Sequence, residues 1–306
     1  AIYSGTPGST WSTATNTSTV VNYFGPNGLG YIPASPSTLG GWTGGDANDV
    51  INAINSGAFM LQHRDHGAYY GWGEPDFQNS DINSLTNSDL SFIFSLNCLT
   101  GQFDYSSECF AEKFHRHTYS GNNAGALGLI AATQVSYSFV NDCFAWGMYD
   151  YMWPDFMPDY GSTNLNMTPA TLLPGFASVS GKYFLAQSNW PYNTGNKDIT
   201  YDLFHLHGDA FTMMYSEVPQ NLNVSHANEL PTGQTSFSVT ANNGSYIALT
   251  VNGEILATAN GTGSAVNMTI PAQSVGSNMV ITITKQNYYR YSATVPVTGT
   301  VNQPIA

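Results

Sequence analysis

Short, continuous apolar runs are separated by longer polar stretches over the first two thirds of the chain. Three of these runs are Ala58–Gln62, Leu90–Leu96 and Gly125–Ala132. Runs of this length and composition are typical of parallel strands that are buried on both faces. The stretches around them predict three helices, at Ala47–Asn55, Cys109–His117 and Val140–Met152. The pattern therefore predicts an α/β unit in which helices flank a parallel sheet.

The pattern changes after Val218, where short alternating segments begin. They lie at Ser236–Thr240, Tyr246–Val251, Glu254–Ala259, Ala265–Ile270, Met279–Thr284 and Ser292–Val297. Turn residues separate them at intervals of about ten residues, which is typical of an antiparallel sandwich. Asn252-Gly253 between two of them indicates a tight hairpin. We therefore expect an α/β domain over 1–218, an all-β immunoglobulin-like sandwich over 219–299, and the start of a linker over 300–306.

Composition narrows the class of protein. Of the 306 residues, 42% are hydrophobic and only 9% are charged, with seven basic and twenty acidic side chains and a net charge of −13. This balance argues against nucleic acid or an anionic membrane as a partner, because few cations are present to neutralise phosphates. The chain contains no run of about 18 apolar residues, so the sequence predicts no membrane-spanning segment. An uncharged polar surface is common in secreted and cell-surface proteins, and we expect that any signal peptide has already been removed.

The candidate chemistry lies directly after two of the predicted strands. The first strand leads into His66-Gly67 and the second into Asn97-Cys98. Parallel strands end at one edge of a sheet, where active sites of α/β proteins form. A thiol needs a neighbouring base to act as a nucleophile near neutral pH, and a histidine on the next strand end supplies one. The chain has three cysteines, so at least one is not paired within it.

Gly67 adds a second element to this pattern. A glycine lets the backbone approach a substrate closely and aim its N–H inward. Together with the N–H of Cys98 it could form the pair of donors that an oxyanion requires. The residues therefore predict a cysteine nucleophile, a histidine acid–base partner and an oxyanion hole.

The segment Asn97–Phe110, NCLTGQFDYSSECF, resembles the nucleophile block of the gingipain family of cysteine peptidases, its lysine-specific branch most of all. The separation of His66-Gly67 from Cys98, a second cysteine at Cys109, and His207-Gly208-Asp209 followed by Val218-Pro219 also match. The resemblance implies a caspase-like α/β fold, endopeptidase activity on protein or peptide substrates, export from a Bacteroidetes-type bacterium, and structural calcium but no catalytic cofactor. By position, it makes His66 and Cys98 the catalytic pair, Gly67 and Cys98 the oxyanion donors, and Cys109 a packing residue.

The chain departs from the family pattern at its beginning. Gingipains carry a further α/β subdomain there, and they orient the histidine with an upstream carboxylate, yet Ala1–Leu39 contains no Asp or Glu. Either a second chain from the same precursor supplies this acid, or the enzyme works with a Cys-His dyad. Asp65 and Glu74 are near His66 in sequence and are the local alternatives.

The resemblance also suggests a substrate-binding position after the third strand. The family's lysine-binding aspartate corresponds, after a shift of one residue, to Asp142, and Tyr137 would line the same position. A carboxylate there would select Lys or Arg before the scissile bond. A helix-capping role for Asp142 is the alternative.

Other functions stay open on the sequence. The pairs His115/His117 and His205/His207 have spacing that can bind zinc, although no further ligand motif accompanies them. The polar loops expected at Asp150–Asp159 and Gly195–Asp202 could bind calcium. A non-catalytic adhesion module built on a peptidase fold is the third alternative.

Overall fold

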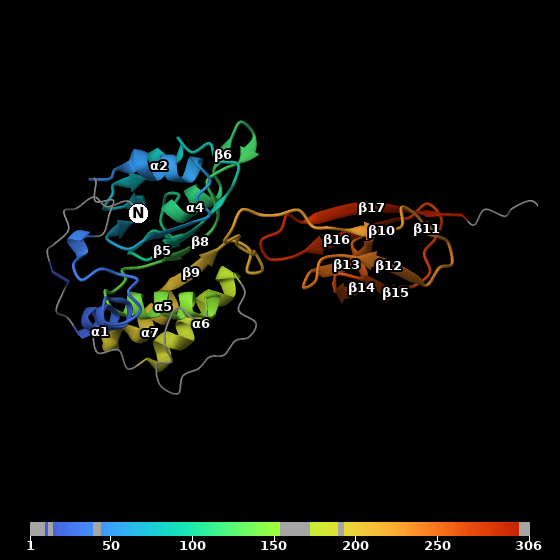
Figure 1. Cartoon of the computed structure of the whole chain (residues 1–306). Coiled ribbons are helices and arrows are strands. Elements are labelled where there is room, and N and C mark those ends of the chain that lie inside the picture. Colours follow the sequence, from blue (N-terminus) through green and yellow to red (C-terminus); the bar gives the residue numbers. More distant parts are fainter. Residues whose placement is uncertain (1–9, 12–14, 39–43, 154–171, 189–192, 300–306) are drawn as a thin grey trace, which may run out of the picture. The chain divides into compact units, whose positions relative to one another are not determined.

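The structure is a computed structural model that describes residues 10–11, 15–38, 44–153, 172–188 and 193–299. Contacts within the chain divide it into two compact units, Ala1–Met214 and Tyr215–Ala306 (Figure 1). The linker expected at 300–306 lies outside the described residues.

The first unit is built on one sheet. Among the described residues it has the strand order β1 (Met60–His63), β5 (Ser91–Ser95), β8 (Ala126–Ala132) and β9 (Phe204–His207). The pairs β1–β5 and β5–β8 are parallel, which confirms the three predicted strands, and β8–β9 is antiparallel. The strand β9 was not predicted, because two histidines in four residues make the run too polar to suggest a buried strand.

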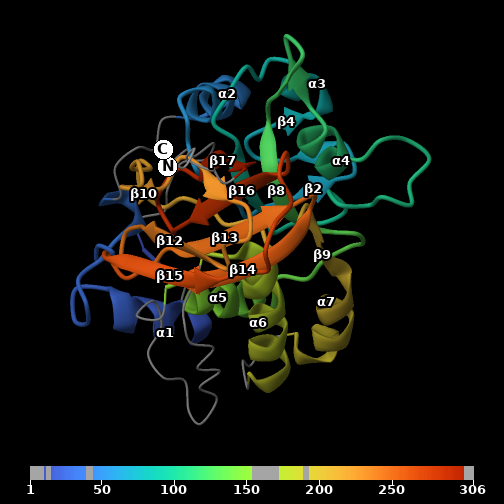
Figure 2. The same cartoon turned by 90° about the vertical axis from the view of Figure 1, so that its right-hand side faces the viewer.

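Helices cover both faces of this sheet. The helices α2 (Ala47–Asn55) and α4 (Phe110–His115) lie on one side, and α5 (Val140–Met152), α6 (Pro174–Gln187) and α7 (Lys197–Leu203) lie on the other (Figures 1 and 2). Side chains of β5 alternate between the two layers: Phe92 and Phe94 pack with the α5–α6 side, and Ile93 packs with the α2–α4 side. The α/β fold with flanking helices is confirmed.

Local sequence explains where the helix α2 begins. The carboxylate of Asp46 accepts hydrogen bonds from the N–H groups of Asn48 and Asp49, and the Asp49 carboxylate accepts one from the Asp46 N–H. This reciprocal capping gives hydrogen-bond acceptors to N–H groups at the start of the helix that have no carbonyl partner within it. The buried residues Val50 and Ile54, four apart, then face the sheet.

One predicted loop is wrong. Gly195–Asp202 was expected to be a polar, calcium-binding loop, but it forms the end of the short helix η2 (Thr194–Asn196) and most of α7. Burial of Thr200 and Leu203 explains the difference, since packing against the rest of the first unit selects a helix where polar composition suggests a loop. Residues 154–159 of the other candidate loop lie outside the described residues.

Small elements complete the first unit. A three-stranded sheet of β2 (Gly67–Ala68), β3 (Gly71–Trp72) and β4 (Phe77–Gln78) follows β1 directly. The remaining elements are α1 (Thr15–Phe24), η1 (Pro36–Thr38), α3 (Asn79–Ile82), β6 (Thr118–Tyr119) and β7 (Asn122–Asn123).

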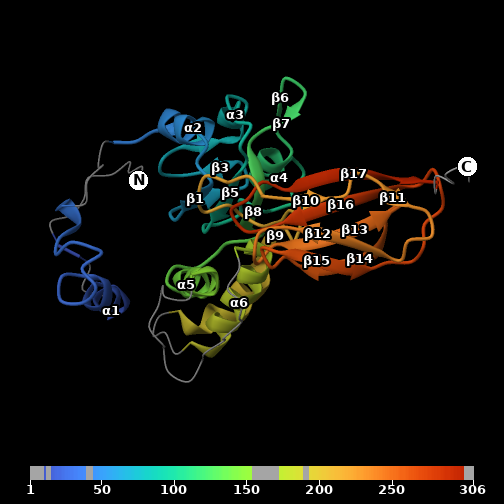
Figure 3. The same cartoon turned by 45° about the vertical axis from the view of Figure 1, so that its right-hand side comes forward.

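The second unit consists of two sheets that share one core. One contains β10 (Ser225–His226), β12 (Ser236–Thr240) and β15 (Ala265–Thr269); the other contains β11 (Leu230–Pro231), β17 (Tyr291–Thr298), β16 (Asn278–Thr284), β13 (Tyr246–Val251) and β14 (Glu254–Asn260) (Figure 3). Apolar side chains of both sheets form a single cluster. The predicted hairpin at Asn252-Gly253 is confirmed, and both residues have positive φ, 52° and 84°. The immunoglobulin-like assignment stays a prediction.

Within the described ranges, no helix is both long enough and apolar enough to cross a membrane.

Candidate active site

The strands β1 and β5 end side by side, with His63 opposite Ser95. His66 and Cys98 each follow their strand by three residues, so the sheet brings the two predicted catalytic residues to neighbouring loops. The closeness of these loops is clearest at Gly67. A Cβ atom added there would lie 2.8 Å from the carbonyl oxygen of Cys98 and 2.7 Å from Oδ1 of Asn97. Only glycine fits this approach.

Cys98 lies at the start of a tight turn. The N–H of Thr100 donates to the Cys98 carbonyl over 2.7 Å, and Leu99 between them has a φ of 63°. A branched, bulky residue with positive φ is uncommon, and such strain concentrates at functional sites. The Leu99 N–H donates to the carbonyl of Gln134 over 3.2 Å, which ties this turn to the loop after β8.

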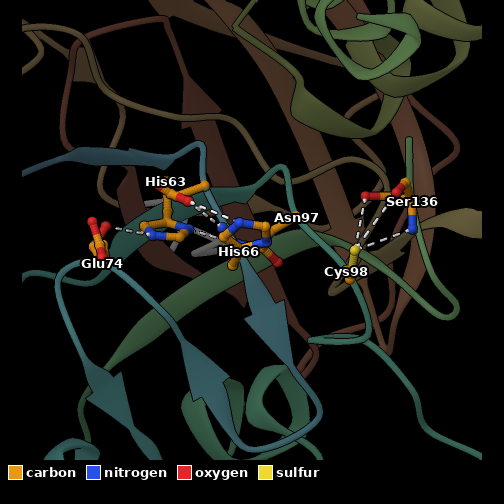
Figure 4. Close-up of polar contacts among 7 residues, drawn as sticks. His63, His66, Glu74, Asn97, Cys98 and Ser136 are labelled. Atoms are coloured by element: carbon orange, nitrogen blue, oxygen red, sulfur yellow. Dashed lines mark hydrogen bonds and ion pairs between the residues drawn. The ribbon is translucent and has the colours of Figure 1, made fainter. Parts of the chain in front are cut away.

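The sulfur of Cys98 contacts Ser136 in that loop. The Ser136 N–H lies 3.4 Å from Sγ, its hydroxyl lies 3.8 Å away, and the thiol is 3.6 Å from the Ser136 carbonyl oxygen (Figure 4). Three contacts from one residue fix where the sulfur points. The sequence did not single out Ser136, although its place after the neighbouring parallel strand was a usable signal.

The imidazole of His66 is exposed. Its side chain is 94% accessible, and Asp65 Oδ1 approaches His66 Nε2 only to 4.0 Å while accepting the His66 N–H over 2.7 Å. Within the described residues, no hydrogen bond joins the His66 ring to Cys98, and Figure 4 links the sulfur to Ser136 instead. The structure therefore brings the loops of the pair together without joining the two side chains.

The hydrogen-bond pattern of the β2–β3 hairpin determines the direction of the Gly67 N–H, one of the predicted oxyanion donors. The Gly73 N–H donates to the His66 carbonyl over 2.9 Å, so these two residues form a hydrogen-bonded pair. The next pair in the ladder, Gly67 and Trp72, is then of the non-hydrogen-bonded kind, in which N–H groups point away from the partner strand. The Gly67 N–H is thus directed away from β3, as an oxyanion donor requires.

A buried polar network fixes the residue before Cys98. The Asn97 amide nitrogen lies 2.7 Å from Nδ1 of His63, and Asn97 Oδ1 accepts from the hydroxyls of Thr100 at 2.7 Å and Ser95 at 3.1 Å. The Trp72 indole N–H donates to the Ser95 oxygen over 2.8 Å. Buried networks with every member satisfied make a local structure unique. This network anchors the turn that presents Cys98.

His63 is the least expected member of this network. Its ring stacks on Trp72 with centroids 4.5 Å apart and planes within 4°. Its Nε2 lies 3.1 Å from the Glu74 carbonyl oxygen (Figure 4). Burial lowers the pKa of His63 from 6.5 to about 4, against smaller effects from the Glu74 hydrogen bond and Asp65 that raise it. His63 is therefore neutral near pH 7, donating from Nε2 and accepting at Nδ1. Glu74 contributes its carbonyl here, and does not reach His66.

Asp142 lies in the first turn of α5 and is already paired. Nε of Arg64 lies 2.8 Å from its Oδ1, with side-chain exposures of 29% and 28%. Arg64 was not predicted as a partner, because the two residues are 78 positions apart. Tyr137 is half-buried and packs against a small cluster formed by Val140, Cys143 and Leu185. Their predicted roles in substrate binding stay predictions.

The other two cysteines differ from Cys98. Both are fully buried, and burial raises the pKa of Cys109 to about 11 and that of Cys143 to about 12. Neither provides a thiolate near neutral pH, whereas Cys98 is partly exposed.

The described residues hold no group of three or more His, Cys, Asp or Glu side chains that could bind a metal ion. In the candidate zinc pairs, His117 Nε2 instead lies 2.9 Å from the Leu85 carbonyl, and His207 Nε2 is buried without a hydrogen bond. The expected calcium remains a prediction.

Comparison with known proteins places this site in a family. Residues 13–215 match Peptidase family C25. The chain belongs to peptidase family C25. Similar sequences include Lys-gingipain of Porphyromonas gingivalis, 29% identical over 254 residues, and gingipain R1 of the same species, 25% identical over 270 residues. These alignments cover 77% and 84% of the chain but only 14% and 25% of the relatives.

Solved structures support the C25 fold. The Arg-specific cysteine proteinase gingipain R superposes with a TM-score of 0.70 at 22% identity, over 83% of this chain and 56% of that one. A complex of Porphyromonas gingivalis RgpB pro- and mature domains gives 0.71 at 21% identity, over 83% and 58%. Both comparisons show the fold, and this chain spans only part of the length of each relative.

Proposed function

We propose that this family C25 chain is the catalytic part of an exported cysteine endopeptidase with Cys98 as nucleophile and His66 as acid–base partner. The observation that carries this proposal is the contact between the two strand-end loops, where Gly67 leaves no room for a Cβ beside Cys98. This contact supports the proposal because a candidate nucleophile, a candidate base and candidate oxyanion donors then share one edge of the sheet.

The proposed reaction proceeds in two steps. The Cys98 thiolate attacks the scissile carbonyl carbon, and the N–H groups of Gly67 and Cys98 stabilise the oxyanion. His66, which holds the thiol proton, transfers it to the leaving amine as the C–N bond breaks, leaving a thioester on Cys98. His66 then takes a proton from water, whose oxygen attacks the thioester, and returns it to the sulfur as the acid product leaves.

We also propose that a second chain from the same precursor completes the site. The His66 side chain is almost fully exposed. Among the described residues, the carboxylate that its ring contacts is that of Asp65, with Nε2 and Oδ1 4.0 Å apart. An exposed ion pair of that length orients a ring poorly. A carboxylate from a partner covering this loop would hold His66 toward Cys98; without such a partner the site would have to work as a dyad.

Cleavage after Lys or Arg is the proposed specificity. Its support is the position of Asp142 at the start of α5, in contact with the loop that carries His66. Two relatives, Lys-gingipain and the Arg-specific proteinase gingipain R, are named for lysine and arginine, which agrees with a carboxylate that selects cations.

The test is hydrolysis of peptides with Lys or Arg before the cut by natively purified protein and by Cys98→Ala. We expect the variant to fold and to retain under one tenth of the activity, and we expect intact mass to show a second, non-covalent chain in the active protein. Full activity of Cys98→Ala would contradict the proposed nucleophile, and full activity of a lone 306-residue chain would contradict the need for a partner.

The exposed ring of His66, whose contact with Asp65 is 4.0 Å long, also suits a second candidate, a non-catalytic binding module. In that case neither wild type nor any complex with a precursor-derived chain would hydrolyse peptides.

A further inference from the structure

The ion pair between Arg64 and Asp142 occupies the carboxylate proposed to bind substrate. The single contact runs from Nε of Arg64 to Oδ1 of Asp142 over 2.8 Å. Both side chains keep more than a quarter of their surface accessible to solvent. Partly exposed pairs of this kind stabilise proteins little, so a competing cation can displace one at low cost.

This pair lies within the candidate site. Arg64 is two residues before His66, on the loop that follows β1. Asp142 follows Asn141, whose amide donates to the Ser136 hydroxyl over 2.8 Å, and that hydroxyl lies 3.8 Å from the sulfur of Cys98. The ion pair therefore connects the loop carrying the candidate base to the segment that contacts the candidate nucleophile.

We propose that Arg64 is a specificity-determining residue that competes with the substrate's own cation for Asp142. This inference rests on the proposed function, since it takes Asp142 as the residue facing the side chain before the scissile bond. A lysine or arginine substrate must displace Arg64 to reach the carboxylate. A neutral side chain leaves the ion pair intact, and so never buries an unpaired carboxylate.

The consequence is a weakened preference for cations. With Arg64 in place, the free energy gained when a cationic side chain binds is only the difference between two similar ion pairs with Asp142. Without Arg64, the same side chain gains a full charge-assisted hydrogen bond with Asp142. Arg64 thereby broadens the substrate range that the carboxylate alone would allow.

The experiment compares Arg64→Gln with wild type on two matched peptide pairs, lysine against norleucine and arginine against citrulline, before the cut. We expect KM for the cationic peptides to fall about three- to tenfold in Arg64→Gln, with kcat and the neutral peptides changed less than about twofold. Arg64→Lys keeps the charge and should behave like wild type. In an Asp142→Asn background, Arg64→Gln should no longer lower KM for the cationic peptides.

A purely structural role for Arg64 makes a different prediction. If Arg64 only holds the His66 loop, Arg64→Gln should lower kcat for cationic and neutral peptides alike, and this result would overturn the proposal. A gain that persists in the Asp142→Asn background would also overturn it.

A binding measurement separates this proposal from the proposed peptidase activity. Nα-acetyl-lysine amide is titrated against Cys98→Ala protein with and without Arg64→Gln, followed by NMR, with Nα-acetyl-norleucine amide as the control ligand. We expect Arg64→Gln to tighten binding of the lysine amide about three- to tenfold and not of the norleucine amide. Unchanged lysine-amide binding overturns the role of Arg64, whereas absence of hydrolysis by wild type overturns only the peptidase activity.

Discussion

The side-chain amide of Asn97, the residue directly before Cys98, donates a hydrogen bond to Nδ1 of His63 over 2.7 Å. Nδ1 can accept this bond only when the imidazole is neutral, which leaves the other ring nitrogen as the donor to the Glu74 carbonyl at 3.1 Å. A proton on His63 would therefore break the contact that anchors the nucleophile's turn. The stability of the fold and the geometry at Cys98 therefore depend on the ionisation of His63, which takes no part in the proposed chemistry.

The first prediction is a loss of stability in mild acid. The pKa of His63 is about 4 in the folded protein and near 6.5 in the unfolded chain, so between these values the unfolded state binds more protons. The free energy of unfolding should then decrease as pH falls from about 6.5 to 4, by up to about 3 kcal/mol, and this contribution should level off below pH 4. Denaturant unfolding at a series of pH values measures it.

The control is His63→Gln, which has no titrating ring. We expect a lower but flatter stability profile over the same pH range. A variant with the same slope as wild type would show that other groups cause the acid sensitivity.

The second prediction concerns Asn97 itself. Asn97→Ala removes the donor to Nδ1 of His63, which is left buried without a partner, and the acceptor shared by the Thr100 and Ser95 hydroxyls, which keep only their contact with each other and that of Ser95 with Trp72. We expect a destabilisation of about 2–3 kcal/mol in denaturant unfolding and a loss of peptidase activity through displacement of Cys98. Asn122→Ala, on the exposed strand β7, is the matched control and should change stability by less than about 0.5 kcal/mol.

A third prediction follows from the close approach at Gly67. In Gly67→Ala the new methyl group would meet Cys98 O at 2.8 Å and Asn97 Oδ1 at 2.7 Å, so the two loops must separate. We expect kcat/KM to fall by roughly 10- to 100-fold, because oxyanion donors lose their alignment. Gly195→Ala places a methyl group in open space and should leave activity unchanged. Wild-type kinetics in Gly67→Ala would exclude this strand from the site.

The fourth prediction is selective alkylation. Cys98 is partly exposed, while Cys109 and Cys143 are buried thiols whose pKa values of about 11 and 12 keep them protonated. Iodoacetamide should therefore modify Cys98 far faster than the other two in native protein, as peptide mass mapping would measure. Replacing His66 with Ala should slow modification of Cys98 if that ring activates the thiol. Equal, slow labelling of all three cysteines would argue against a reactive nucleophile.

Much of the fold follows from local sequence. The runs that became β1, β5 and β8 are apolar enough to need burial on both faces, and the helices α2 and α5 begin and end where the pattern predicted. Turn chemistry determined the Asn252-Gly253 hairpin, since both positions require positive φ. Strand ends and a Cys–His pair on them were enough to locate the candidate site.

Contacts between distant residues were decided only by the tertiary structure. Arg64 meets Asp142 across 78 positions, and Cys98 meets Ser136 across 38, because parallel strands bring their following loops to one edge. The neutral state of His63 depends on burial by neighbours that no local pattern reveals. Sequence periodicity determines which segments are buried, whereas pairing of polar side chains depends on the geometry that follows when those segments pack.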